Sequence, residues 1–76
     1  MSQSRIEIMI KILEVALNEA TKTKIALTAN LREEMVQMYL GLLQDEGLLE
    51  FWPINNTYKT TDKGRRLIRK AQKVFS

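Results

Sequence analysis

The side chains that could carry out chemistry in this sequence are carboxylates, lysines, arginines and hydroxyls. The 76 residues include no cysteine and no histidine. This excludes thiolate nucleophiles and disulfides, and it removes the commonest general base and metal ligand. A catalytic centre would have to use carboxylates or lysine in a chain too short to enclose a sizeable cleft. We therefore expect no enzymatic activity, no catalytic residue, no metal site, no cofactor and no small-molecule ligand.

The basic residues are concentrated in the C-terminal segment. The whole chain has 12 basic and 9 acidic side chains, a net charge of +3. Residues 62–76 hold six basic side chains and one acidic side chain, a net +5, whereas residues 1–61 hold six basic and eight acidic ones, a net −2. The basic segment could bind phosphates or another acidic partner. It could equally be a solvated helix face that keeps a small protein in solution, and charge alone leaves both interpretations open.

Length and composition predict one small globular domain over residues 1–76. Hydrophobic residues make up 45% of the chain and charged residues 28%, which is ordinary for a globular protein. No apolar run approaches the roughly 18 residues of a membrane span. Charged residues also interrupt the N-terminal region where a signal peptide would need an apolar core. We therefore expect a cytoplasmic protein that has no membrane partner.

The first predicted helix begins after Ser4, its N-cap, and runs to Ala20. Its polar residues form one narrow stripe, so its apolar arc is much wider than the roughly 100° that a surface helix needs. A second face of this helix must therefore be covered, either by the last helix or by another chain. A short second helix is predicted over residues 24–29, with Thr23 as its N-cap.

Asn30 is predicted to start a third helix, because Glu33 three residues later completes a capping-box pair. This helix ends at about Glu46, before Gly47, a residue type suited to the position after a helix. Helical spacing predicts a set of inward-facing residues. They are Leu31, Met35, Val36, Tyr39, Leu40 and Leu43.

The remaining sequence predicts a hairpin and a last helix. Residues 48–52 and 57–60 are strand-like, and Asn55 and Asn56 between them suit a turn because asparagine tolerates positive φ. Thr61 is predicted to cap a helix over about residues 62–75, whose apolar residues recur at helical spacing. The predicted class is therefore α+β, mainly α, with three helices, a two-stranded hairpin and a C-terminal helix.

Three stretches resemble winged helix-turn-helix proteins, and most closely a group of small archaeal DNA-binding members. Residues 40–49, LGLLQDEGLL, resemble the end of the recognition helix and the first strand of the wing. Residues 58–64, YKTTDKG, are similar to the joint between the second wing strand and the last helix, and residues 22–31, KTKIALTANL, to the helix-turn-helix entry. The resemblance implies a winged helix-turn-helix fold over nearly the whole chain. It also implies a transcription regulator or chromatin-associated protein of the nucleoid, which dimerises through its C-terminal helix.

This resemblance implies that the helix over residues 31–46 lies in the major groove of double-stranded DNA. Arg32 would then contact a guanine edge or a phosphate, and Gln37 an adenine edge. Residues at the start of the second helix would touch the DNA backbone, and the hairpin tip would approach the minor groove. The implied DNA-binding residues are Lys22, Thr23, Lys24, Arg32, Glu33, Gln37, Met38, Asn55, Asn56 and Lys59.

Glu33 and Glu34 are poorly suited to a helix that faces a polyanion. A glutamate can accept a hydrogen bond from cytosine, but we favour a role for both at the helix N-terminus through capping and the helix dipole. The uncharged turn at Asn55 and Asn56 and the net −2 of residues 1–61 have the same implication. They support the alternative of a winged-helix protein-interaction module that does not bind DNA.

A homodimer is predicted through the first and last helices. The first helix has two apolar rows and the last helix has an apolar stripe of its own, so a two-fold interface would cover both. The predicted interface consists of Ile8, Ile12, Val15, Leu67, Ile68, Ala71, Val74 and Phe75. Trp52 leaves three interpretations open: a dimer anchor, a stacking platform for a base, or a cover for the outer face of the hairpin.

Overall fold

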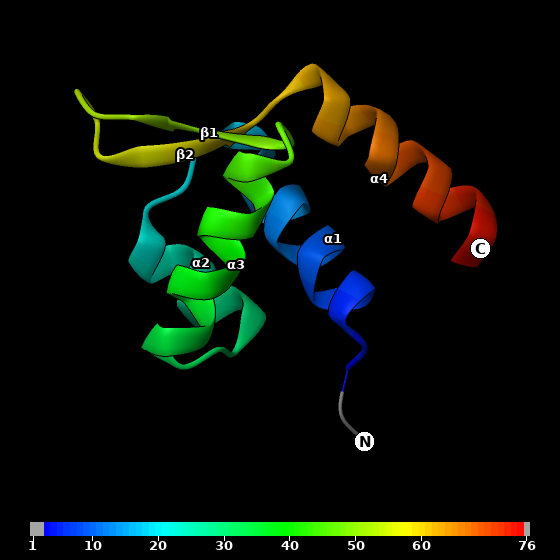
Figure 1. The fold of residues 1–76 in the computed structure, drawn as a ribbon, viewed down its shortest axis with the longest axis horizontal. Coiled ribbons are helices and arrows are strands. Elements are labelled where there is room, and N and C mark those ends of the chain that lie inside the picture. Colours follow the sequence, from blue (N-terminus) through cyan, green and yellow to red (C-terminus); the bar gives the residue numbers. More distant parts are fainter. Residues whose placement is uncertain (1–2, 76) are drawn as a thin grey trace.

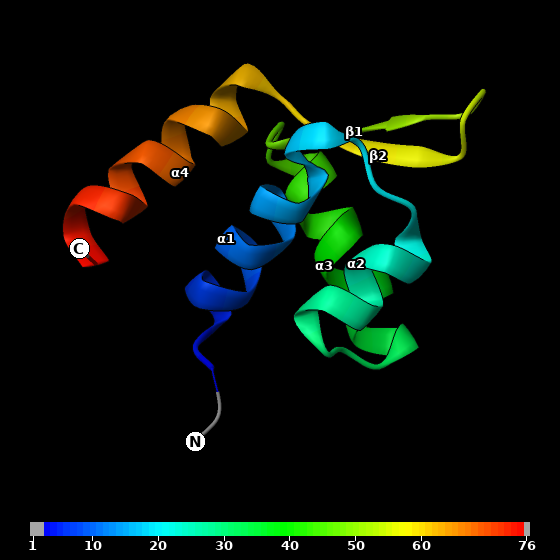
Figure 2. The ribbon, with the colours of Figure 1, turned by 180° about the vertical axis from the view of Figure 1, so that it is seen from behind.

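The computed structural model describes residues 3–75 and confirms the predicted class, mainly α with one two-stranded sheet. Figures 1 and 2 show the β1–β2 hairpin projecting at one end of the molecule and α4 at the other, with α1 between them. The elements in chain order are α1 (Arg5–Val15), the 3₁₀ turn η1 (Ala16–Asn18), α2 (Lys22–Ala29), α3 (Glu33–Asp45), β1 (Leu49–Trp52), β2 (Thr57–Thr60) and α4 (Asp62–Phe75).

Helix α1 begins as predicted but ends five residues earlier. Ser4 is its N-cap, and reciprocal hydrogen bonds between Ser4 and Glu7 form a capping box. After η1 the backbone of Glu19 adopts a positive φ of 58°. Ala20, the predicted helix end, instead pairs with Tyr58 of β2 through two backbone hydrogen bonds of 2.8 and 2.9 Å. The backbone N–H and carbonyl of Ala20 are therefore hydrogen-bonded to β2 and not within a longer α1.

The predicted starts of the second and third helices are wrong by two or three residues, whereas their predicted ends agree with the structure to within one residue. The N-cap of α2 is Thr21, whose hydroxyl accepts a hydrogen bond from the backbone N–H of Lys24 at 3.1 Å, rather than Thr23. Asn30 does not start α3. It ends α2 in the left-handed conformation, with φ 55° and ψ 51°. Asparagine is common both as an N-cap and in left-handed C-terminal positions, so its type alone does not distinguish the two.

The C-terminus of α3 is closed by a glycine, as predicted. Gly47 has a φ of 74°. Its N–H donates to the carbonyl of Gln44 at 3.0 Å, and the N–H of Leu48 donates to the carbonyl of Leu43 at 2.9 Å. This pair of bonds is the Schellman arrangement, which satisfies free carbonyls of the last turn. It also turns the chain directly into β1.

The wing is an antiparallel hairpin in which Leu49 pairs with Thr60 and Phe51 with Tyr58. The aromatic rings of Phe51 and Tyr58 lie 4.9 Å apart between centroids. At the base of the wing the buried hydroxyl of Thr60 donates to the carbonyl of Leu13 at 2.6 Å. A two-stranded hairpin is marginal alone, and this bond and the Ala20–Tyr58 bridge are two of the contacts that attach the wing to the helices.

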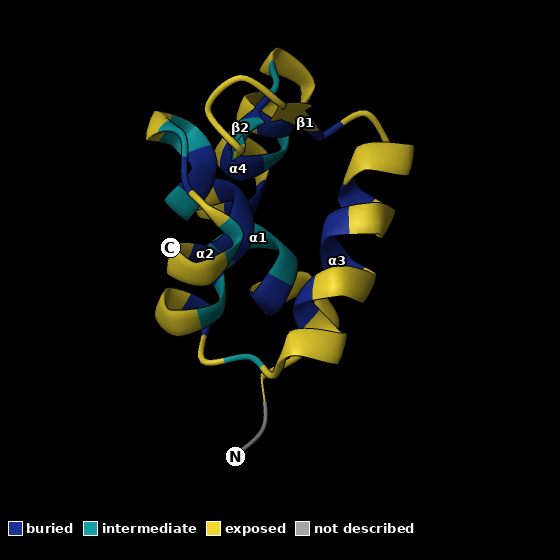
Figure 3. Cartoon of the chain, turned by 90° about the vertical axis from the view of Figure 1, so that its left-hand side faces the viewer, coloured by how far each residue is buried: buried dark blue, intermediate teal, exposed yellow. Residues whose placement is uncertain are grey.

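The core lies between α1, α2 and α3, and α4 closes it by packing Ile68 and Ala71 toward α1. Figure 3 shows α3 with a buried inner side and an exposed outer side. Met35 is wrongly predicted to face inward, since 38% of its surface is exposed. No helix among the described residues is both long and apolar enough to cross a membrane. The largest fully buried side chains are Ile12, Leu13, Ile25, Val36, Leu40 and Leu43.

Candidate nucleic-acid interface

The start of α2 carries the basic residues that the family resemblance assigns to contacts with the DNA backbone. Thr21 caps the helix, so Lys22, Thr23 and Lys24 occupy its first turn. Thr23 and Lys24 are exposed. Lys22 is instead paired with Glu33, with Nζ 3.1 Å from Oε1. The first turn of α2 therefore offers one unpaired cation and one hydroxyl to a phosphate.

The exposed surface of α3 is acidic. Arg32, the N-cap of α3, is exposed and makes no side-chain capping bond. Glu34 and Gln37 are also exposed, on the side of the helix away from the core. The helix itself, residues 33–45, contains three acidic and no basic residues. A side chain that neutralises a phosphate can therefore come only from its flanks.

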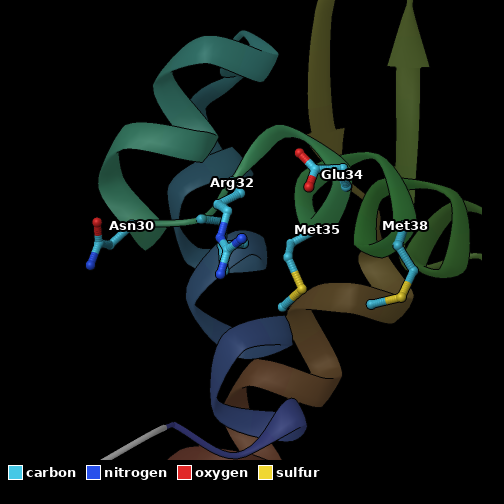
Figure 4. Close-up of a pocket in the computed structure, with 6 residues that line it drawn as sticks. Asn30, Arg32, Glu34, Met35 and Met38 are labelled. Atoms are coloured by element: carbon cyan, nitrogen blue, oxygen red, sulfur yellow. The ribbon is translucent and has the colours of Figure 1, made fainter.

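Three apolar side chains follow one another along the same outer surface. Met35, Met38 and Leu42 are 38%, 49% and 41% exposed and recur at i, i+3 and i+7. Met35 and Met38 line a hollow of about 450 Å³, and Figure 4 shows Arg32 next to Met35. Asp45 of α3 and Arg5 of α1 border a second hollow beyond Met38. The sequence analysis missed this line because it assigned Met35 to the core and Met38 to DNA binding, although the i, i+3, i+7 spacing was visible in the sequence.

The wing is held in place by a residue that the sequence analysis also missed. The carboxylate oxygen Oε1 of Glu19 accepts hydrogen bonds from Nδ2 of Asn55 at 3.2 Å and from Oγ1 of Thr57 at 2.8 Å. Asn56 has a φ of 54° at the tip, as its type predicted. The tip residue Ile54 is 98% exposed. The tip of the wing is therefore uncharged, and hydrogen bonds to Glu19 hold it in position.

The ammonium of Lys59 is hydrogen-bonded rather than free. Its ammonium donates to the carbonyl of Leu17 at 3.1 Å and lies 6.0 Å from the ring centroid of Trp52. The indole N–H of Trp52 donates to Oε1 of Glu50 at 3.0 Å. Trp52 therefore covers part of one face of the hairpin, with 37% of its surface still exposed.

Helix α4 presents a dense cationic surface. All six of its basic side chains are exposed, and Asp62 in its first turn is its only acid. Lys63 differs from the other five because its ammonium already has a partner. It donates a hydrogen bond to the carbonyl of Glu46 at 2.8 Å, just after the end of α3. Arg65 makes a loose ion pair of 4.0 Å with Asp62. The others are Arg66, Arg69, Lys70 and Lys73.

Half of the predicted dimer interface is buried within one chain. Ile8 and Ile12 of α1 and Ile68 and Ala71 of α4 are core residues, with Ile12 completely inaccessible. These four cannot contact a second copy as predicted, because α1 and α4 cover each other. Val15 and Leu67 are half-buried against the same core, and Val74 is exposed. The side chain of Phe75 lies outside the described residues.

The geometry combines an α2–α3 pair, a wing attached beside it and a cationic C-terminal helix. No curated protein matches this chain. A family model described as winged helix-turn-helix matches residues 3–76. The chain therefore belongs to the winged helix-turn-helix family, whose members typically bind DNA and are generally not enzymes.

Proposed function

We propose that this chain binds double-stranded DNA as a small transcription regulator or chromatin-associated protein of the nucleoid. The observation that carries the proposal is the exposed cationic surface of α4, a net +5, on a member of a family that typically binds DNA. Phosphates attract such a surface whatever the base sequence. The resemblance to small archaeal DNA-binding proteins supports the same function.

In this proposal α3 lies in the major groove, where Arg32 and Gln37 reach base edges. Thr23 and Lys24 contact the sugar–phosphate backbone, and the wing tip at Asn55 and Asn56 approaches the minor groove. Four residues of the predicted set contribute less, since each already has a partner within the chain. They are Lys22, Glu33, Asn55 and Lys59.

The charge distribution predicts binding that is mostly sequence-independent. Because α3 contains no basic residue, the attraction to phosphates comes from Lys24, Arg32 and the basic side chains of α4. If about six cations neutralise phosphates, the logarithm of the binding constant falls with the logarithm of salt concentration with a slope of about −5. Base reading by Arg32 and Gln37 adds a smaller, sequence-dependent increment.

The first experiment is a salt titration of binding to a mixed-sequence duplex of about 30 base pairs, followed by fluorescence anisotropy. We expect measurable affinity at low salt and a steep loss toward physiological salt. A triple substitution of Arg66, Lys70 and Lys73 by alanine should reduce the slope by about three. Absence of binding at the lowest salt would contradict DNA binding to mixed sequence.

The second experiment tests the assignment of α3 to the major groove. The variant Arg32→Ala with Gln37→Ala is compared with Arg65→Ala with Gln72→Ala, which removes the same two residue types from the exposed surface of α4. Both lose one positive charge. Only the α3 pair should reduce discrimination between a selected duplex and a random one, by about tenfold. Equal discrimination in the two variants would exclude a base-reading role for Arg32 and Gln37.

A second candidate function is a protein-interaction module without DNA binding. The observation that favours it is the exposed line Met35, Met38 and Leu42 on a helix that has no basic residue. Exposed apolar side chains such as these are suited to contact with a partner protein rather than with phosphates. The salt titration separates the two candidates, because a module of this type has no affinity for a duplex.

We also propose that the protein forms a homodimer. Among the side chains that the structure describes, the predicted α1–α4 interface retains Val15, Leu67 and Val74 as accessible apolar residues, and of these Val74 alone is largely exposed. These three side chains offer less surface than a stable isologous contact, which buries about 800 Å² on each partner. The surface of α3 is the better candidate.

A further inference from the structure

The spacing of the exposed apolar residues on α3 is that of a paired helix. Met35, Met38 and Leu42 are separated by three and then four residues, as are the inward positions of two helices that pack knobs into holes. They form a strip beside the buried face of α3, which holds Val36, Tyr39, Leu40 and Leu43. The apolar surface of α3 is therefore about twice as wide as the core requires.

The two long edges of this strip carry opposite charges. Helix α2 packs on the side of α3 that bears Glu33, and Arg5 of α1 borders the strip near Tyr39 on the other side. Helical spacing then places Glu34 and Asp45 on the edge of the strip away from α1. Arg32 lies beside Met35 at the N-terminal end, as Figure 4 shows.

We propose that this strip of α3 is a contact surface for a second copy of the chain, with the two α3 helices parallel about a two-fold axis. The edge with Arg5 and Arg32 of each copy then faces the edge with Glu34 and Asp45 of the other. Met35, Met38 and Leu42 pack against their counterparts. An antiparallel pair would bring like-charged edges together, so charge complementarity selects the parallel arrangement.

The proposed contact is small, and its symmetry limits the assembly to two copies. A two-fold axis uses the same surface on both copies, so it produces a dimer rather than a fibre. Three apolar side chains and four charged ones cover less surface than a standard interface, and we expect a dissociation constant of roughly micromolar order. The proposal does not depend on DNA binding. A duplex seated against α3 would cover the same strip, so the free dimer and the DNA complex would exclude each other.

The test is sedimentation equilibrium of the full chain without DNA. Met38→Glu places two like charges at the centre of the contact and should weaken dimerisation at least about tenfold. Leu27→Glu is the matched control, because Leu27 is an exposed apolar residue on α2 away from the strip, and it should leave the dimer unchanged. Circular dichroism establishes that both variants fold.

A charge exchange tests the arrangement of the edges. Arg32→Glu makes both edges acidic at this level, Glu34→Arg makes both basic, and each should weaken the dimer. The double variant restores opposite charges and should recover most of the affinity. A chain that stays monomeric up to about 1 mM overturns the proposal. So does a dimer that resists Met38→Glu and dissociates with Val74→Glu, because its interface would then lie on α4. DNA binding is measured separately, so neither result bears on it.

Discussion

The ammonium nitrogen of Lys22 lies 3.1 Å from Oε1 of Glu33, and this ion pair joins the first turn of α2 to the first turn of α3. The side chain of Glu33 is 75% exposed. A pair this accessible to water contributes about 0.2–1 kcal/mol to stability at most. We expect its larger effect to be on the proposed DNA binding, because both residues are predicted DNA contacts and each neutralises the other.

Glu33→Gln is expected to strengthen binding to a duplex more than Glu34→Gln. Both substitutions remove one negative charge from the first turn of α3, but only Glu33→Gln also releases Lys22 to bind a phosphate. We expect the two variants to differ by about two- to five-fold in affinity, from the strength of an exposed ion pair. Anisotropy at fixed salt measures this difference. Equal gains in affinity would show that Lys22 does not reach the DNA.

Thr60→Val is expected to destabilise the fold through the attachment of the wing. The hydroxyl of Thr60 is buried and donates to the carbonyl of Leu13 at 2.6 Å. Valine keeps the shape but leaves that carbonyl without its donor, which should cost about 1–3 kcal/mol of unfolding free energy. Urea denaturation measures the loss. Thr28→Val, on the exposed surface of α2, is the control and should change stability by less than about 0.5 kcal/mol.

Local signals in the sequence predict the elements of this fold because each element carries its own start and stop residues. Three residues have the roles that their types predict. Ser4 and Thr61 cap the starts of α1 and α4, and Gly47 closes the end of α3. Errors arise where one residue type suits two roles. Asn30 suits both an N-cap and a left-handed helix end, and the local sequence does not choose between them.

The candidate site is harder to predict because it depends on contacts between distant residues. Lys59 reads as a free cation, but its ammonium is bound by Leu17, 42 residues away. Glu19 reads as the polar end of a helix, but it anchors the wing through Asn55 and Thr57. Met35 has a core-like spacing, yet it lies at the exposed border of the buried face. Charge and periodicity identify the surfaces but not the partners of individual side chains.

The capping box at Ser4 predicts a pH dependence of stability. The hydrogen bonds from the Ser4 side chain and backbone lower the pKa of the Glu7 carboxyl below its ordinary value of 4.5. A carboxyl with a lowered folded-state pKa stabilises the fold above its unfolded pKa, and this contribution is lost as pH falls through the folded pKa. Ser4→Ala should therefore raise the pKa of Glu7 toward 4.5. Carbon-13 NMR titration of the carboxyl measures it.

The stability measurement for Ser4→Ala should agree in sign with that titration. The variant should be less stable than the parent at neutral pH, and the difference should shrink when the pH is taken well below 4.5, where Glu7 is protonated in both proteins. Urea denaturation at several pH values gives the comparison. A difference that stays constant with pH would mean that the Ser4 hydroxyl acts only on the backbone of α1.

Gly64 and Gly41 are expected to respond oppositely to alanine. A Cβ at Gly64 would collide with the carbonyl oxygen of Leu48 and come within 2.5 Å of Cγ2 of Thr60. Thr60 cannot turn away without breaking its bond to Leu13, so Gly64→Ala should cost about 1–3 kcal/mol of unfolding free energy. A Cβ at Gly41 meets nothing within 4 Å, and there alanine should stabilise α3 by about 0.5–1 kcal/mol. Urea denaturation followed by Trp52 fluorescence compares the two, and a Gly64→Ala protein as stable as the parent would mean that α4 can shift away from the start of β1.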